Sequence, residues 1–180
     1  GWGENKEGQL GFKEDGFIEG GSYDSVQLIP KQNPVLKDIV SIAAGVDISA
    51  ALDANGHVWV WGSASGGDGI MPKNIITDTH IVNVRAGGWN GVVALLKDNG
   101  DAVVFAGKNG FLDENSRFEV GNGKLGMAGR VVDMSFDGNS FFALSEYGHV
   151  YSYGSNTMGD LGLGDIHDRK TFSMIKSFGR

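Results

Sequence analysis

The side chains with the most evident chemical potential are the four histidines, at positions 57, 80, 149 and 167. Imidazoles bind zinc only when three or four ligands converge in space. His57 and His149 each follow a glycine at the tip of an expected hairpin, so they occupy equivalent positions in two separate hairpins. The histidine pattern therefore predicts no metal site.

Two acidic stretches are the other candidates for chemistry. The segment GLGDIHD carries Asp165 and Asp168, and the segment FLDENS carries Asp113, Glu114 and Asn115. Neither has the alternating ligand spacing of a calcium loop, and such acids are common in solvated turns. The sequence also lacks a Walker loop, an HExxH motif and a GxSxG motif. We therefore expect no catalytic residue, no bound cofactor and no metal ligand.

The composition predicts an all-β chain that reverses direction often. Glycine accounts for 30 of 180 residues, more than twice the ordinary share of about 7%, and only three prolines are present. The formal net charge of −7 disfavours direct binding of nucleic acid, which depends on clustered Lys and Arg. No apolar run reaches the ~20 residues that a membrane-spanning helix needs, so we expect no membrane association.

Three tandem segments, at residues 39–62, 81–107 and 131–154, share one pattern. In each segment a leucine stands four residues before a turn glycine, and apolar residues flank the turn as in a hairpin. The pairs are Leu52 with Gly56, Leu96 with Gly100, and Leu144 with Gly148. Together with short strand candidates in the connections, such as residues 25–30 and 171–175, the pattern predicts about four strands per unit.

Each unit closes on a glycine, at Gly62, Gly107 or Gly154, and Gly3 matches these three. The middle hairpin has one more residue before its closing glycine than the others, which predicts a β-bulge between Gly100 and Gly107. The aromatic residues at or beside the closing positions are expected to pack between units. These residues are Trp2, Trp59, Trp61, Phe105 and Tyr153.

The closing glycine also opens a second repeat. The stretch GENKEGQLG at residues 3–11 and the stretch GSNTMGDLG at residues 154–162 share Gly, Asn, Gly, Leu and Gly at identical offsets. The stretch GNGKLGM at residues 121–127 keeps part of this pattern. We interpret the two full matches as equivalent loops of two repeat units.

These motifs resemble the repeat of the regulator of chromosome condensation family. IAAGVDISAALDANGHVWVWG at residues 42–62 is similar to the first half of that repeat, and the glycine loops are similar to its second half. The resemblance implies a seven-bladed β-propeller of four-stranded antiparallel blades. Residues 1–180 are then one partial propeller of three to four blades, with further blades supplied by the same or another chain. The resemblance also favours a cytoplasmic or nuclear location.

One turn in the pattern draws attention to a binding surface. Trp89 and Asn90 lie in AGGWNGVV, where the first strand of a unit turns into the second. An exposed tryptophan in such a turn is a suitable partner anchor, although the same residue could instead pack between blades. Asp47 and Asn139, in the other two units, complete the set of candidate partner-binding residues.

The resemblance leaves three functions open. The first is a non-catalytic module that binds a protein partner through loops on a rigid frame. The second is a guanine-nucleotide exchange factor for a small Ran-like GTPase, which would need a projecting hairpin; the connections at residues 11–34 and 108–130 are the candidates for it. The third is docking on chromatin, which the net charge disfavours.

Overall fold

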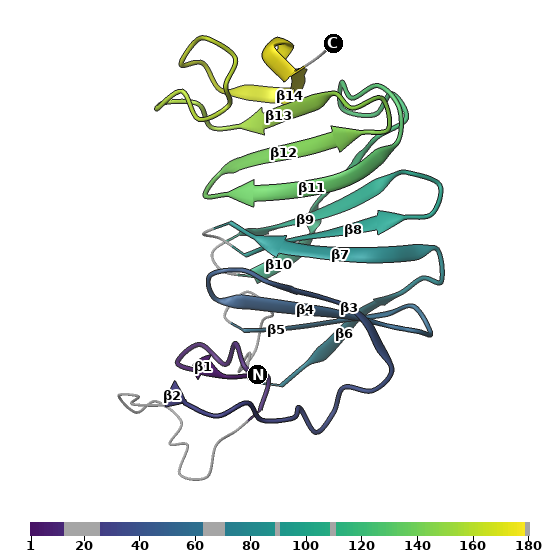
Figure 1. The fold of residues 1–180 in the computed structure, drawn as a ribbon, viewed down its shortest axis with the longest axis vertical. Helices are drawn as coiled ribbons and strands as arrows, with labels where there is room; N and C mark the ends of the chain where they lie inside the picture. Colours follow the sequence, from purple (N-terminus) through teal and green to yellow (C-terminus); the bar gives the residue numbers. More distant parts are fainter. Residues whose placement is uncertain (13–25, 63–70, 89–90, 109–110, 179–180) are drawn as a thin grey trace.

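The computed structural model describes residues 1–12, 26–62, 71–88, 91–108 and 111–178, and three four-stranded antiparallel sheets account for most of them (Figure 1). Sheet I contains β3 (Ile39–Ala44), β4 (Ile48–Asp53), β5 (His57–Gly62) and β6 (Lys73–Thr77). Sheet II contains β7 (Ile81–Gly87), β8 (Val92–Lys97), β9 (Ala102–Lys108) and β10 (Phe111–Val120). Sheet III contains β11 (Val131–Asp137), β12 (Ser140–Ser145), β13 (Val150–Gly154) and β14 (Arg169–Met174). The prediction of an all-β chain with four strands per unit is confirmed.

Two short elements complete the described fold. Near the N-terminus β1 (Gly3–Glu4) pairs antiparallel with β2 (Val26–Gln27). A 3-10 helix, η2 (Lys176–Phe178), follows β14. No helix among the described residues has the length and apolar character needed to cross a membrane.

The sheets stack one upon the next, and their hydrophobic cores lie between them (Figure 1). Between sheets I and II, Leu52 and Val60 face Val84 and Leu95. The next cluster joins sheet II to sheet III. Its buried members are Val92, Ala94, Leu96, Ala102, Val104, Val120, Met127, Val131, Met134, Phe141, Ala143, Tyr151 and Phe172. All of β8 from Val92 to Leu96 is buried, because this strand has a neighbouring sheet on each face.

Aromatic rings fill the outer part of the junction between sheets II and III. Phe141 meets Phe136, Phe118 and Tyr153 at centroid distances of 5.3, 5.9 and 5.4 Å, and Tyr153 stacks on Phe172 at 5.4 Å. Edge-to-face and offset pairs of this kind stabilise a core by about 0.5–1.5 kcal/mol each beyond the area they bury. The packing expected of Tyr153 is thus found.

The inner strands β3, β7 and β11 also carry polar contacts between sheets. The hydroxyl of Ser41 donates to Asn83 Oδ1 at 2.6 Å. Arg85 Nε donates to Asp133 Oδ1 at 2.8 Å, while Arg85 Nη1 donates to Asn83 Oδ1. These bonds tie the inner strands in addition to the apolar clusters beside them.

The turns of two outer hairpins are built alike. In sheet I the backbone N–H of His57 donates to the carboxylate of Asp53 at 3.0 Å, and in sheet III the N–H of His149 donates to the hydroxyl of Ser145 at 3.2 Å. The predicted equivalence of His57 and His149 follows from this geometry. Each turn has a glycine at positive φ, which L residues with a side chain rarely adopt.

Three expectations about the repeat units are wrong: the bulge, the closing glycine at position 107 and the packing of Trp2. The β8–β9 ladder is regular from Val92 paired with Ala106 to Leu96 paired with Ala102, so the predicted bulge is not in this hairpin. The register shift lies on the other side of β9, in its pairing with β10. Ala106 therefore occupies the place of Gly62 and Gly154, one residue before Gly107. Trp2 is 67% exposed rather than packed.

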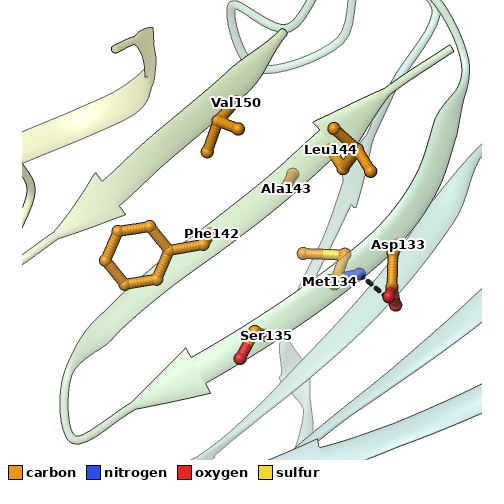
Figure 2. A pocket seen from close by; sticks show the side chains of 7 residues that line it. All are labelled: Asp133, Met134, Ser135, Phe142, Ala143, Leu144 and Val150. Atoms are coloured by element: carbon orange, nitrogen blue, oxygen red, sulfur yellow. Dashed lines mark hydrogen bonds between the residues drawn. The ribbon is translucent and has the colours of Figure 1, made fainter. Parts of the chain in front are cut away.

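The outer face of sheet III is apolar and open. A hollow of about 150 Å³ lies over β11, β12 and β13 (Figure 2), lined by Asp133, Met134, Ser135, Phe142, Ala143, Leu144 and Val150. Leu144 is 38% exposed, whereas its equivalents Leu52 and Leu96 are 1% and 4% exposed. The next sheet covers each of those two leucines, whereas no described sheet covers Leu144.

The different exposure of Leu96 and Leu144 predicts that truncating them lowers the free energy of unfolding by different amounts. Leu96→Ala leaves a cavity in a closed core and is expected to lower the free energy of unfolding by about 2–5 kcal/mol. Leu144→Ala, in this 180-residue chain, is expected to cost less than ~1 kcal/mol because its side chain is already partly hydrated. Urea denaturation followed by circular dichroism measures both. Equal losses would contradict the assignment of an open face.

Candidate partner-binding face

The turns between the first and second strands of the three sheets lie at one edge of the stack, along the left side of Figure 1. The described residues at these turns are 45–47, 88, 91 and 137–139. At this edge the inner strands approach closely: a Cβ on Gly45 would lie 3.1 Å from the Cα of Gly87, and a Cβ on Gly87 would lie 3.0 Å from the Cβ of Phe136. A side chain at Gly45 or Gly87 would therefore be crowded, because neighbouring sheets converge there.

The closing glycines bring the second set of loops to the same edge. Gly62 and Gly154 have φ of 100° and 114°, and a Cβ on either would collide with the carbonyl oxygen of Asp47 or Asn139. Two of the predicted partner-binding residues, Asp47 and Asn139, thus occupy one equivalent position beside a closing glycine. The described loop that leaves Gly154, at residues 155–162, therefore begins at this edge.

The loops that follow are organised by buried asparagines. In residues 3–11 the side chain of Asn5 accepts the N–H of Leu10 at 2.9 Å and donates to the carbonyl of Phe12 at 3.1 Å. In residues 154–162 Asn156 accepts the N–H of Leu161 at 2.9 Å and donates to the carbonyl of Asp165 at 2.8 Å. Both asparagines are fully buried. The interpretation of these stretches as equivalent loops is confirmed.

Each loop is also fastened to a sheet. The carbonyl of Gln9 accepts hydrogen bonds from Ser49 Oγ at 2.9 Å and from Trp61 Nε1 at 2.7 Å, which joins the first loop to sheet I. The carbonyl of Leu161 accepts the hydroxyl of Ser152 at 2.9 Å. Both loops are therefore anchored to the sheets by hydrogen bonds.

A polar hollow of about 520 Å³ lies where the second loop meets the turn of sheet III. Its lining residues come from two segments: Asp137, Gly138, Asn139 and Ser140 from the turn, and Ser155, Thr157 and Asp160 from the loop. The hydroxyl of Ser140 donates to the carbonyl of Ser155 at 3.0 Å and fixes the two walls. Among the described residues, neither Asp137 nor Asp160 forms an ion pair.

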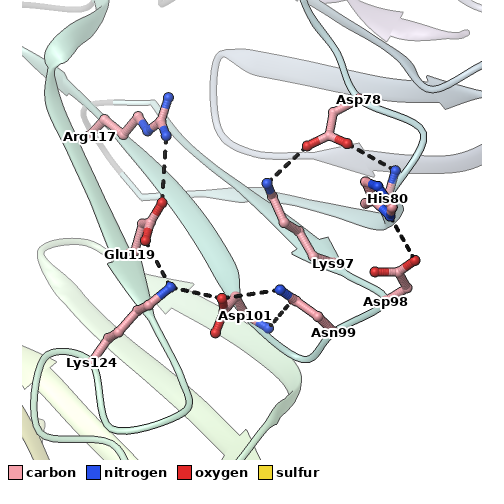
Figure 3. Close-up of polar contacts among 9 residues, drawn as sticks. All are labelled: Asp78, His80, Lys97, Asp98, Asn99, Asp101, Arg117, Glu119 and Lys124. Atoms are coloured by element: carbon pink, nitrogen blue, oxygen red, sulfur yellow. Dashed lines mark hydrogen bonds and ion pairs between the residues drawn. The ribbon is translucent and has the colours of Figure 1, made fainter.

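Charged side chains at the opposite edge of the stack are paired with one another (Figure 3). The ammonium of Lys124 bridges Asp101 and Glu119 at 2.8 and 2.9 Å, and its hydrogen bond holds the pKa of Asp101 below its usual range. Lys97 pairs with Asp78 at 2.9 Å. The opposite edge thus carries paired charges, whereas the hollow carries two carboxylates that form no ion pair among the described residues.

The structure describes two of the four predicted partner-binding residues. Asp47 is half-buried and Asn139 is exposed, each in its turn. Trp89 and Asn90 lie outside the described residues, so both interpretations of Trp89 stay open. The structural role of the two loop asparagines was missed by sequence reasoning, although their repeated offset was a usable signal. Among the described residues, no group of three or more His, Cys, Asp or Glu side chains is placed to bind a metal ion.

The stack of similar four-stranded sheets, each turning its inner strand to one side, is part of a β-propeller. Two solved structures of yeast RCC1 (Prp20), one of them bound to Kap60, superpose with TM-scores of 0.71 and 0.69 at 17% and 20% identity. Each covers 97% of this chain, which covers 45% of the yeast chain. The fold is thus shown to match part of this propeller.

Sequence comparison gives the family. Two models described as the regulator of chromosome condensation (RCC1) repeat match residues 1–52 and 39–68. An RCC1 repeat-containing protein of Dictyostelium discoideum is 28% identical over 90% of this chain, and the regulator of chromosome condensation of Mus musculus is 29% identical over 89%. The chain therefore contains RCC1 repeats and is similar along most of its length to RCC1-repeat proteins. It spans 36% and 44% of the lengths of these two relatives.

The buried asparagines predict matched losses of stability. Asn156→Ala leaves the buried N–H of Leu161 without its acceptor and is expected to lower the free energy of unfolding by about 1–3 kcal/mol. Asn5→Ala is expected to do the same for Leu10. Thr157→Ala, an exposed position in the same loop, is expected to change stability by less than ~0.5 kcal/mol. Urea denaturation distinguishes them, and an Asn156→Ala variant as stable as Thr157→Ala would contradict the role.

The ion pair of Asp165 predicts a dependence on acid pH. The guanidinium of Arg169, at 2.5 Å, lowers the pKa of the Asp165 carboxyl from 3.8 to about 2. Because the folded-state pKa is depressed, its contribution to stability is present above pH 4 and is lost as the pH falls toward 2. Asp165→Asn is expected to be less stable than the parent at neutral pH, with a gap that narrows in acid. Asp160→Asn is the matched control; thermal unfolding at several pH values tests the difference.

Proposed function

We propose that this chain is a non-catalytic module that binds a protein partner through the edge carrying the turns at residues 45–47 and 137–139. The observation that carries the proposal is the hydrogen bonding that anchors this edge: Asn5 and Asn156 order its two described loops, and the carbonyls of Gln9 and Leu161 join these loops to the sheets. Rigid loops on a scaffold lose little conformational entropy on binding. The unpaired carboxylates of the hollow add a charge for a partner to recognise.

The similar proteins support a protein as the partner. Yeast Prp20 is described in complex with Kap60, and Prp20p is described by its binding properties to Gsp1p and histones. The relation is distant, and this chain covers less than half of that protein. Only the class of partner, a protein, is therefore transferred to this chain.

The alternative is guanine-nucleotide exchange on a Ran-like GTPase, favoured by the described binding of the yeast relative to Gsp1p. An exchange factor acts by binding the nucleotide-free state more tightly, so no catalytic side chain is needed. The connection at residues 108–130, a candidate for the projecting hairpin, includes β10, which pairs along β9 as the outer strand of sheet II. Residues 13–25 of the other candidate lie outside the described residues. We therefore place the non-catalytic module first.

Binding and exchange are separated by one pair of assays. The 180-residue chain is immobilised and exposed to purified Gsp1p, Kap60 and core histones, and release of labelled GDP from Gsp1p is followed with and without the chain. We expect saturable binding of at least one protein and an unchanged release rate. Faster release would favour the exchange factor. Binding of none of the three would contradict the proposal, and salt-sensitive retention of DNA would favour chromatin docking.

A further inference from the structure

We propose that Met158, together with Asp137 and Asp160, forms the docking point for a short protein segment that carries an apolar side chain beside lysine or arginine. The inference rests on the proposed function and names the chemistry of the partner. It depends on three features of the described residues: the exposure of Met158, the rigidity of its loop, and the unpaired carboxylates of the adjoining hollow.

Met158 is 85% exposed at the tip of the loop at residues 154–162. The equivalent residue in the first loop is Glu7, at the same offset from its asparagine and its glycine. Glu7 is exposed even though sheet I packs beside that loop, so this offset faces solvent with a following sheet in place. The exposure of Met158 therefore does not depend on what packs on sheet III.

An apolar residue at this offset is not required by the fold, because a glutamate serves equally well in the first loop. Met158 is nonetheless held in one place, since Gly159 on one side donates its N–H to the carbonyl of Asn156 at 2.9 Å and Asn156 is buried. A flexible thioether on a fixed backbone suits a contact with varied apolar side chains. It offers apolar area at little cost in backbone entropy.

The hollow beside Met158 supplies the charge. Asp137 lies in one wall of the hollow and Asp160 in the other. Thr157, the residue before Met158, also lies in the second wall. No basic side chain among the described residues pairs with either carboxylate, in contrast to the paired acids in Figure 3. A volume of about 520 Å³ is large enough to admit a lysine or arginine side chain. Anionic partners such as nucleic acid or an acidic membrane would be repelled.

The test uses the chain labelled with ¹³C at its methionine methyl groups. The five methionines give separate signals, and Met158 is assigned by its loss in Met158→Leu. The capped peptide SGKLKGS is titrated in, with SGELEGS and SGKSKGS as matched peptides. We expect SGKLKGS to shift the Met158 signal saturably while the buried Met127 and Met134 signals stay in place. SGELEGS is expected to have no effect, and SGKSKGS a weaker one.

Variants without the carboxylates test whether the shift of the Met158 signal arises from binding at the hollow. Asp137→Asn with Asp160→Asn is expected to weaken the affinity for SGKLKGS by ~10-fold or more, since both carboxylates are lost. Glu4→Gln with Glu7→Gln removes the same charge from the other loop. This variant is expected to change the affinity for SGKLKGS by less than ~2-fold. Equal effects of the two double variants, an equal response to SGKLKGS and SGELEGS, or a Met158 signal that does not move would overturn the inference.

The two proposals fail in different ways. Saturable binding of a whole protein by the immobilised chain, unchanged in the Asp137→Asn, Asp160→Asn variant, would support the module and overturn the docking point. Loss of whole-protein binding in that variant, with the Glu4→Gln, Glu7→Gln control intact, would support both.

Discussion

The packing of one sheet against the next is the constraint on which the rest of this structure depends. A sheet with a neighbouring sheet on each face must be apolar on both faces. Strand β8 is an example, because every residue from Val92 to Leu96 is buried. Burial of a leucine or valine stabilises the folded chain by about 1.5–3 kcal/mol, so each junction outweighs any single polar contact at the surface. The polar bonds of Arg85 and Ser41 link the inner strands of neighbouring sheets within that packing.

The loops follow from the same constraint. Because sheets converge at one edge, Gly45 and Gly87 must lack side chains there, and the closing glycines must pass beside a turn carbonyl. A chain that leaves such a glycine has buried amides to satisfy, and Asn156 satisfies one of them with its side-chain oxygen while its amide group donates elsewhere. Hydrogen bonds to the buried asparagine therefore determine the conformation of the loop. Its outward-facing side chains are not needed to maintain that conformation.

Much of this could be predicted from the sequence because it is periodic. The leucine and the turn glycine recur at one spacing, and this placed the three hairpins and their four-stranded units correctly. The register of β9 could not be predicted: the sequence places a glycine at 107, but cross-strand pairing puts Ala106 at the closing position. The exposure of Trp2 and Leu144 depends on which sheets lie beside them, and a local pattern carries no information about that. The hollow joins segments from two loops, so no single stretch indicates it.

Repetition also separates the positions that serve the fold from those that are free to serve a partner. Asn, Gly and Leu occupy the same offsets in the loops at residues 3–11 and 154–162, and each has a structural reason in hydrogen bonding, positive φ or burial. Glu7 and Met158 share an offset but not a chemistry, and so do Gln9 and Asp160. At those offsets the frame accepts either residue, so the choice of methionine and aspartate beside the hollow is not dictated by packing.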